Sequence, residues 1–517
     1  MKPGGNDVQG SGSNIGYTVG ENTSDRFQFV ISSGTPVRKW DYVSIDYGDT
    51  KILGRIERIV SRSELLNDSM DFSSIQKYVE SDIIDRVSIC QARTIGTFED
   101  GRLRQSRDLL HPGLKVYSAD SSMLQNAFGY PGDDALEIGY LGDRTDVKVS
   151  VSANGLRRHL AIVAQTGAGK SHTAGVIMEE LLKKGASIIV LDPHADYVFM
   201  KSGGTRNSYS RFIRIFRTPL STGRYELNGK GIVEEFTLRF QDLTSEDLAG
   251  IMNIRENWTN LSGIVDAAQK AMTGKGDFQD FLNALDTLKP EDKRKIDGRI
   301  KFLKKIRGIF SEATTGKGDY LAPGQMSILD LSGMDQFMAN YFSYRVVSEI
   351  YESKLSSTYR FPVFIFIEEA HDFVPPATNT QISQLIKRIA SEGRKFGIFL
   401  VVITQRPGKI DQDVLSQCNS EIILRITNPM DQKAVMESGE SVGESIMSDL
   451  PSLDVGEGIL LGEFVKMPVI VKIRKRETNE GGGDVDIVAL LKESLLERSR
   501  KTDPDSIRKD ISSLMGD

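Results

Sequence analysis

The sequence predicts an α/β fold in which a largely parallel sheet follows a small N-terminal β-barrel, is interrupted by a helical insertion and leads to a C-terminal arm. Three observations predict this architecture. From about residue 144, apolar runs of strand length alternate with helical spacing, as in successive βαβ units. Between residues 17 and 98, short apolar runs alternate with turn residues. Between residues 241 and 315, helical spacing continues without strand-like runs.

The composition is that of a globular protein with more than one domain. The 517 residues are 39% hydrophobic and 26% charged. Two cysteines, Cys90 and Cys418, make no disulfide framework and fit a reducing compartment. The N-terminus is polar and the apolar runs are only strand-sized, so we expect a cytoplasmic protein without a signal peptide or membrane span. A formal net charge of −6 argues against a broad basic surface that coats DNA.

The N-terminal part is expected to be a β-barrel domain, residues 17–98, behind a flexible segment, residues 1–16. Four runs within this domain have strand character, and a fifth stretch, 73–84, has helical character; the strand runs are 27–33, 41–48, 51–60 and 87–98. Residues 99–143 contain Gly and Pro at intervals and are expected to connect this domain to the sheet.

The core of the protein is expected in two parts, residues 144–240 and 316–476, on either side of the insertion at 241–315. Buried parallel strands are predicted from apolar runs within the segments 186–197, 325–333, 361–371, 396–405 and 418–427. Helices are predicted between them, at 338–355 and 381–396. Residues 456–475 predict a closing hairpin, and residues 477–517 a C-terminal arm.

The stretch AIVAQTGAGKSHT, residues 161–173, has the strand–turn–helix pattern of a P-loop. Small residues let backbone N–H groups face a polyphosphate at the start of a helix. Lys170 is expected to reach the β- and γ-phosphates of ATP, and Ser171 to bind Mg²⁺. Ala164 stands where the usual motif has Gly, which requires a negative φ at that residue. The predicted nucleotide-binding residues are Thr166, Gly167, Ala168, Gly169, Lys170, Ser171 and His172.

The apolar run VFIFI ends abruptly in two carboxylates, Glu368 and Glu369. Adjacent acids at the end of a buried strand are costly unless a cation or a reacting water uses them. We expect Glu368 to act on Mg²⁺, although the usual acid at this place is the shorter Asp. We expect Glu369 to be the general base that activates water.

Two further strand ends carry polar residues. Gln405 ends the next strand, where it could contact the γ-phosphate and report its hydrolysis, and the alternative is a simple polar strand cap. Asp192 ends the strand at 186–192, where it could orient the site, and a helix N-cap ahead of Pro193 is nearly as good an explanation.

The segments AQTGAGKS, LDPHADY, IEEAH and TQRPGKIDQDVLSQC, in this order and around a helical insertion, resemble the HerA family. These archaeal hexameric DNA translocases and helicases have a RecA-like P-loop ATPase core and are related to the FtsK and VirB4 ATPases. The resemblance covers most of the chain. It implies a homohexameric ring around double-stranded DNA, ATP and Mg²⁺ at subunit interfaces, and a NurA-like nuclease partner in DNA end resection, docked on the β-barrel domain.

The resemblance also implies a basic residue supplied by the neighbouring subunit to stabilise the transition state. Arg394 matches the position of the family's finger, and Arg158 is a second candidate; ordinary surface ion pairs are the alternative for both. For DNA contact we single out the loop from Lys201 to Arg211, and the pair Arg406 and Lys409. The basic run at 293–307 is more simply a solvated helix face.

Three other functions fit less well. A VirB4- or FtsK-like ATPase that pumps another polymer, in secretion or segregation, would be expected to show a membrane segment, and none is apparent. A nucleotide-gated scaffold would not need Lys170, Glu368 and Glu369 together. A GTPase is disfavoured because TNPMD, residues 427–431, lacks the lysine of a guanine-specificity loop.

Overall fold

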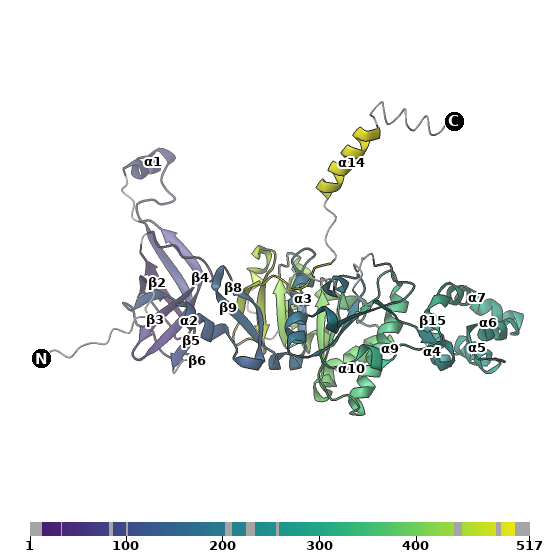
Figure 1. Cartoon of the computed structure of the whole chain (residues 1–517). Helices are drawn as coiled ribbons and strands as arrows, with labels where there is room; N and C mark the ends of the chain where they lie inside the picture. The colour runs from purple at the N-terminus through teal and green to yellow at the C-terminus, as the bar shows by residue number, and fades with distance from the viewer. Residues whose placement is uncertain are drawn as a thin grey trace.

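The computed structural model describes residues 13–32, 34–81, 86–99, 102–201, 209–223, 233–254, 258–438, 447–481 and 487–501. The described chain forms a barrel, a large mixed sheet with helices on both faces and a small helical domain, arranged in this order along the molecule, and a C-terminal helix that projects beside the large sheet (Figure 1). The predicted fold class is therefore confirmed. The expected flexible segment at residues 1–16 lies mostly outside the described residues.

The barrel has the strand order β2-β1-β7-β3-β4-β5-β6, and pairing between β2 and β5 closes it. Its strands are β1 (Asn14–Val19), β2 (Arg26–Ile31), β3 (Tyr42–Tyr47), β4 (Thr50–Arg62), β5 (Val87–Glu99), β6 (Arg102–Arg104) and β7 (Lys115–Ser118). Alternate apolar side chains such as Phe27, Phe29 and Ile45 fill its interior. Helix α1 (Phe72–Glu80) stands at the tip of the β4–β5 hairpin (Figure 1).

The segment 99–143, expected to be a simple connector, is largely structured. Strand β7 belongs to the barrel, where it pairs with β1 and β3. Helix α2 (Ser121–Phe128) follows, and β8 (Ala135–Leu141) with β9 (Arg144–Ser152) forms the edge of the large sheet. These strands are short or lie at an edge, so their apolar periods are too brief to separate them from turns by sequence.

The large sheet has the order β13-β12-β16-β11-β17-β18-β10-β19-β20-β21-β8-β9. It is parallel from β13 to β19 and antiparallel beyond. Its other strands are β10 (Leu160–Val163), β11 (Ser187–Asp192), β12 (Ile213–Arg217), β13 (Val233–Glu235), β16 (Met326–Asp330), β17 (Val363–Ile367), β18 (Ile398–Thr404), β19 (Ser420–Leu424), β20 (Glu457–Gly462) and β21 (Val469–Ile473). The predicted parallel strands and the closing hairpin are confirmed, whereas β12 was not predicted.

Helices cover both faces of this sheet. Along β11, Ile188 and Val190 belong to one apolar core while Ile189 and Leu191 belong to the other, so the strand is buried on both sides. Helix α3 (Lys170–Lys183) packs into the first core, and α9 (Gln336–Leu355) and α10 (Gln381–Phe396) pack into the second. The carboxyl ends of the parallel strands therefore meet at one edge of a rigid slab.

The insertion is helical, as predicted. It contains α4 (Ser245–Ile251), α5 (Thr259–Lys270), α6 (Phe278–Asp286) and α7 (Pro290–Lys305), flanked by the short pair β14 (Leu238–Arg239) and β15 (Phe310–Ser311). On α7 the side chains of Ile296, Ile300 and Leu303 are buried, so its basic residues lie on the remaining faces of the helix.

The remaining helices are α8 (Lys317–Tyr320), α11 (Gln412–Ser416), α12 (Pro429–Ser438) and α14 (Ile487–Lys501). Helix α14 projects from the body, and six of its apolar side chains, Ile487, Val488, Leu490, Leu491, Leu495 and Leu496, are exposed (Figure 1). Within the described ranges, no helix combines the length and the apolarity needed to cross a bilayer.

Candidate active site

The predicted site residues gather at the carboxyl edge of four strands in the middle of the large sheet. The P-loop follows β10, Asp192 ends β11, the two glutamates follow β17, and Gln405 follows β18. In a parallel sheet with crossover helices, this edge is where ligands bind. The four segments are far apart in sequence, and the strand order places them side by side.

The P-loop adopts the backbone conformation that its sequence requires. Gly167 and Gly169 have φ of 77° and 101°, which L-residues rarely adopt. Ala164 does not have a positive φ, and its N–H donates to the Thr404 carbonyl at 3.2 Å. The expectation that an alanine fits at this position is therefore confirmed.

Lys170 lies between the two glutamates. Its Nζ is 2.6 Å from Oε1 of Glu368 and hydrogen-bonds Oε1 of Glu369. Both carboxylates are buried, with Glu368 fully inaccessible. The sequence placed these three residues in one site on the strength of two separate motifs, and the structure brings their charged atoms into contact.

The two glutamates have opposite pKa shifts. Burial raises the pKa of Glu368 beyond what Lys170 and Tyr197 offset. Burial also acts on Glu369, but the contacts with His371 and Lys170 outweigh it and lower the pKa of Glu369 to about 2. Glu369 is therefore a carboxylate throughout the physiological pH range, as a group that accepts a proton from water must be.

Asp196, Tyr197 and His371 also belong to the site, and none of them was assigned a role from the sequence. The Ser171 hydroxyl donates to Oδ2 of Asp196 at 3.1 Å, and the Tyr197 hydroxyl donates to Oε2 of Glu368. His371 places Nδ1 3.2 Å from Oε2 of Glu369. The segments LDPHADY and IEEAH contain all three, but only the fold shows which of their polar residues face the P-loop.

Asp192 holds the loop that carries Asp196 and Tyr197 in place. It is fully buried, and its carboxylate accepts the backbone N–H groups of Asp196 at 3.0 Å and Tyr197 at 2.9 Å. Asp192 thus orients the site from behind. No hydrogen bond of its side chain to the P-loop appears among the described residues.

Gln405 is hydrogen-bonded to the P-loop, and Glu369 has an uncommon backbone conformation. Oε1 of Gln405 accepts from the Thr166 hydroxyl at 2.5 Å, which ties the candidate sensor to the P-loop. Glu369 has φ of 47°, a left-handed conformation that is uncommon for residues other than Gly, Asn and Asp. Non-glycine residues persist in such conformations where the surrounding structure fixes them, often at functional sites.

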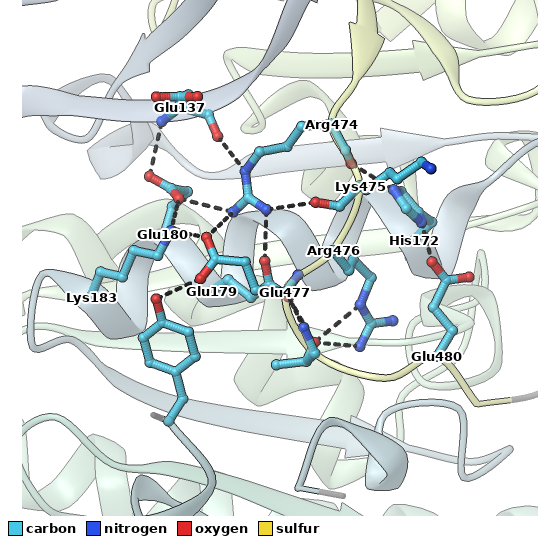
Figure 2. Close-up of polar contacts among 12 residues, drawn as sticks. Glu137, His172, Glu179, Glu180, Lys183, Arg474, Lys475, Arg476, Glu477 and Glu480 are labelled. Carbon is cyan, nitrogen blue, oxygen red and sulfur yellow. Dashed lines mark hydrogen bonds and ion pairs between the residues drawn. The ribbon is translucent and has the colours of Figure 1, made fainter. Parts of the chain in front are cut away.

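His172, predicted to bind nucleotide, packs against the chain that leaves β21. Its Nε2 lies 2.8 Å from the Arg474 carbonyl, and its Nδ1 contacts Glu480 (Figure 2). Arg474 in turn bridges Glu179 and Glu180 of α3, each at 2.9 Å (Figure 2). The ring of His172 is thus held on the side of α3 that this C-terminal segment covers.

The two candidate finger residues lie away from the P-loop of their own chain. Arg158 precedes β10 and Arg394 precedes β18, so both stand at the amino edge of the sheet, opposite the site. Arg158 pairs with Glu463 at 2.5 Å, an exposed ion pair of the ordinary kind, whereas Arg394 is exposed and makes no ion pair within the described part of the chain.

His159, the residue after Arg158, connects the start of β10 to β18 and to α10. Its Nδ1 accepts the Leu400 N–H at 2.9 Å, so its Nε2–H donates to the Ala390 carbonyl at 3.0 Å. The imidazole is buried, and both burial and the charge of Arg394 lower the pKa of His159 to about 4. No sequence motif pointed to this buried histidine.

The candidate DNA loops are only partly described. Residues 202–208, the middle of the loop from Lys201 to Arg211, lie outside the described residues. The expectation for Lys201 was wrong: its side chain is buried and its ammonium group donates to the Ile213 carbonyl. Arg211, Arg406 and Lys409 are exposed.

Comparison with known proteins shows to which family the chain is similar. A family model described as "Helicase HerA, central domain" matches residues 136–350, and one described as "HAS barrel domain" matches residues 15–100. A probable helicase of Methanocaldococcus jannaschii is 30% identical, with 95% of this chain and 96% of the relative covered. A protein of Sulfurisphaera tokodaii, named DNA double-strand break repair helicase HerA, is 29% identical, with 92% and 95% covered.

Among solved structures, VirB4 of Thermoanaerobacter pseudethanolicus aligns over 67% of this chain and 98% of its own, at 16% identity and a TM-score of 0.44. The relatives in sequence extend over both the barrel and the P-loop core. The chain therefore belongs to the HerA helicase family.

Proposed function

We propose that this protein is an ATP-dependent DNA translocase and helicase that drives double-stranded DNA through the central pore of a homohexamer. In this role it works with a NurA-like nuclease in end resection for double-strand break repair. The observation that carries the proposal is the contact of Lys170 with Glu368 and Glu369 at the carboxyl edge of the sheet. The names of the relatives supply the polymer on which such an ATPase acts.

In the nucleotide site, each residue has a distinct task. The P-loop amides from Thr166 to Ser171 face the phosphates, and Lys170 turns from the glutamates toward the β- and γ-phosphates. Lys170 thus exchanges the two glutamates for phosphates, and its buried ammonium group has an anionic partner in both arrangements.

The donor set suits Mg²⁺. Ser171, Asp196 and Glu368 bring a hydroxyl and two carboxylates together, and hard oxygen donors are what this ion prefers. These residues would hold it directly or through water. A bound Mg²⁺ would neutralise charge that develops on the phosphates.

Glu369 acts as the general base. Its low pKa keeps it ionised, and His371 and the backbone at φ of 47° fix its orientation. Gln405, through Thr166, reports the state of the γ-phosphate to the P-loop and to β18.

In a ring, the carboxyl edge of the sheet in one subunit faces the amino edge of the sheet in the next subunit. Arg394 and Arg158 stand at the edge remote from their own P-loop, so they are available to the site of a neighbouring subunit. Arg394 is the better candidate because its guanidinium group is exposed and makes no ion pair in the described chain, while Arg158 is paired with Glu463. Such a residue stabilises charge in the transition state of phosphoryl transfer.

DNA is held through its backbone, independent of sequence, by local basic loops such as that of Arg406 and Lys409. This fits a chain with a net charge of −6. The nuclease docks on the barrel, and the protein works in the cytoplasm.

The test is ATP hydrolysis with and without linear duplex DNA, together with mass in solution. We expect hydrolysis that DNA stimulates, a mass six times that of one chain, and loss of hydrolysis in Lys170→Ala. Arg38→Ala, which breaks an exposed ion pair between the barrel domain and the turn before β9, serves as a matched control for loss of a basic residue. A monomer whose hydrolysis ignores DNA would contradict the proposal.

A further inference from the structure

A short segment, residues 449–456, connects the barrel to the P-loop. It begins at Asp449, which contacts the barrel, and ends at Gly456, directly before β20. Neither end was singled out from the sequence. Hydrogen bonds at its two ends join it to a barrel side chain, Trp40, and to the P-loop backbone at Ala168.

At the barrel end, Asp449 receives two donors from one loop. Nε1 of Trp40 donates to Oδ2 of Asp449 at 2.8 Å, and Nζ of Lys39 donates to Oδ1. Trp40 has φ of 76°, and the guanidinium group of Arg55 lies 4.1 Å from the centre of its ring. The barrel therefore presents the indole N–H in one fixed orientation.

The middle of the segment is anchored. Leu450 and Leu453 are buried in the core of the large sheet. The carbonyl of Asp449 accepts the N–H of Ser452 at 3.0 Å, which closes a short turn. A segment held in this way transmits a displacement of Asp449 instead of absorbing it.

At the other end, the P-loop rests on Gly456. The Gly456 N–H donates to the carbonyl of Ala168 at 3.2 Å, and the Gly456 carbonyl accepts the N–H of Ile473 at 2.9 Å. The carbonyl of Ala168 and the N–H of Gly169 belong to one rigid peptide unit. A shift of Gly456 therefore rotates an amide that faces the phosphates.

The surroundings leave room for such a shift. A cavity of about 590 Å³ lies between the barrel and the sheet, lined by Lys39, Trp40, Asp449 and Glu457 among others. Close packing does not lock the two domains at this place, so the polar contacts of Asp449 carry the connection.

We propose that Asp449 is a positioning residue that couples the barrel to the P-loop, so that a change at the barrel alters the affinity for nucleotide. The inference rests on the P-loop being an ATP site, as in the proposed function. It does not depend on which protein docks on the barrel.

The test compares nucleotide affinity in two variants of the full-length protein. Trp40→Phe keeps an aromatic ring below Arg55 and removes the N–H together with part of the indole, and Asp449→Asn removes the charge. Asp143→Asn is the matched control, because Asp143 also pairs with this barrel loop, through Arg38 at 2.7 Å, but its ion pair is exposed and is not part of the 449–456 segment. The measurement is the Kd of a fluorescent ATP analogue with Mg²⁺, alongside kcat, KM and the thermal unfolding midpoint.

We expect Kd and KM to rise about three- to tenfold in Trp40→Phe and in Asp449→Asn, with kcat within about twofold of wild type. In the double variant the rise in Kd should be smaller than the two single effects combined, because both changes act on the contacts of Asp449. The control should bind like wild type.

Unchanged Kd in Trp40→Phe, a variant that cannot donate to Asp449, would overturn the inference, as would an equal rise in the control. A fall in the unfolding midpoint with no change in Kd would assign Asp449 a structural role only, which also overturns it. If wild type fails to bind the ATP analogue, the proposed function falls and this inference falls with it.

Discussion

Replacing Glu369 with glutamine tests the central assignment, because it changes charge with little change in shape. In the structure, Oε1 of Glu369 accepts from Lys170, and Oε2 lies 3.2 Å from Nδ1 of His371. A glutamine amide retains an oxygen that accepts from Lys170 but is far too weak a base to take a proton from water. Lys170 keeps Glu368 at 2.6 Å as a charged partner. The fold of the site should therefore survive.

The size of the effect follows from these contacts. A positioned general base contributes about 10²- to 10⁴-fold, or about 3–5 kcal/mol of transition-state stabilisation, so kcat should fall by at least two orders of magnitude. ATP affinity should hold or rise, because one of the two anions that compete with phosphate for Lys170 is gone. The expected signature is loss of kcat without loss of binding.

The assay pairs steady-state hydrolysis with direct binding of ATP. Glu369→Asp is the matched control, because it keeps the charge and aspartate tolerates the left-handed backbone at this residue. It should retain partial activity. Since the contacts with His371 and Lys170 lower the pKa of Glu369 to about 2, kcat/KM should also show no acid limb from this group above about pH 4. Robust hydrolysis by Glu369→Gln would refute the reasoning.

Three further predictions concern other parts of the site. Mixed rings of Arg394→Ala and Lys170→Ala subunits should recover hydrolysis at hybrid interfaces, and no recovery at any mixing ratio would contradict action in trans. Tyr197→Phe removes a buried donor from Glu368, which should cost ~1.5–3 kcal/mol and lower the thermal unfolding midpoint; an unchanged midpoint would contradict it. Burial lowers the pKa of His159 to about 4 from 6.5, so its stabilising effect is complete above pH 6.5 and is lost as the pH falls toward 4. By pH 5 the loss is about 2 kcal/mol, measured as the difference in urea unfolding between wild type and His159→Gln, which should lack this pH dependence.

Local motifs predicted most of the site because their geometry is set within a few residues. The run ending in Lys170 and Ser171 requires a strand, a turn with positive φ and a helix, and the structure has all three. The position of Glu368 and Glu369 followed from a buried apolar strand that stops at two acids. Parallel strands then bring the two motifs together without further information from the sequence.

The rest could not be predicted because it depends on contacts between distant segments. Asp196 and Tyr197 stand in a segment whose polar residues look equivalent until Asp192, buried beneath them, fixes which of them face the P-loop. Lys201 looked like a solvated loop cation, yet its stem is buried and its ammonium group caps the Ile213 carbonyl. In these cases the role of a residue depends on whether its side chain is buried, and that depends on the contacts of the whole fold.

The charges of Lys170, Glu368 and Glu369 make the binding of nucleotide depend on the binding of a cation. Lys170 is the cation that lies between Glu368 and Glu369, which are adjacent in sequence and both buried. When Lys170 turns to the phosphates, the two carboxylates lose the charge that offsets their burial and their mutual repulsion. One of them must then gain a proton or face a new cation. Contacts with His371 and Lys170 lower the pKa of Glu369, so the departure of Lys170 removes part of what keeps this carboxylate ionised. A divalent cation beside Ser171 and Glu368 resolves the same imbalance, so ATP should bind far more tightly with Mg²⁺ than without it, and Glu369→Gln should reduce that dependence.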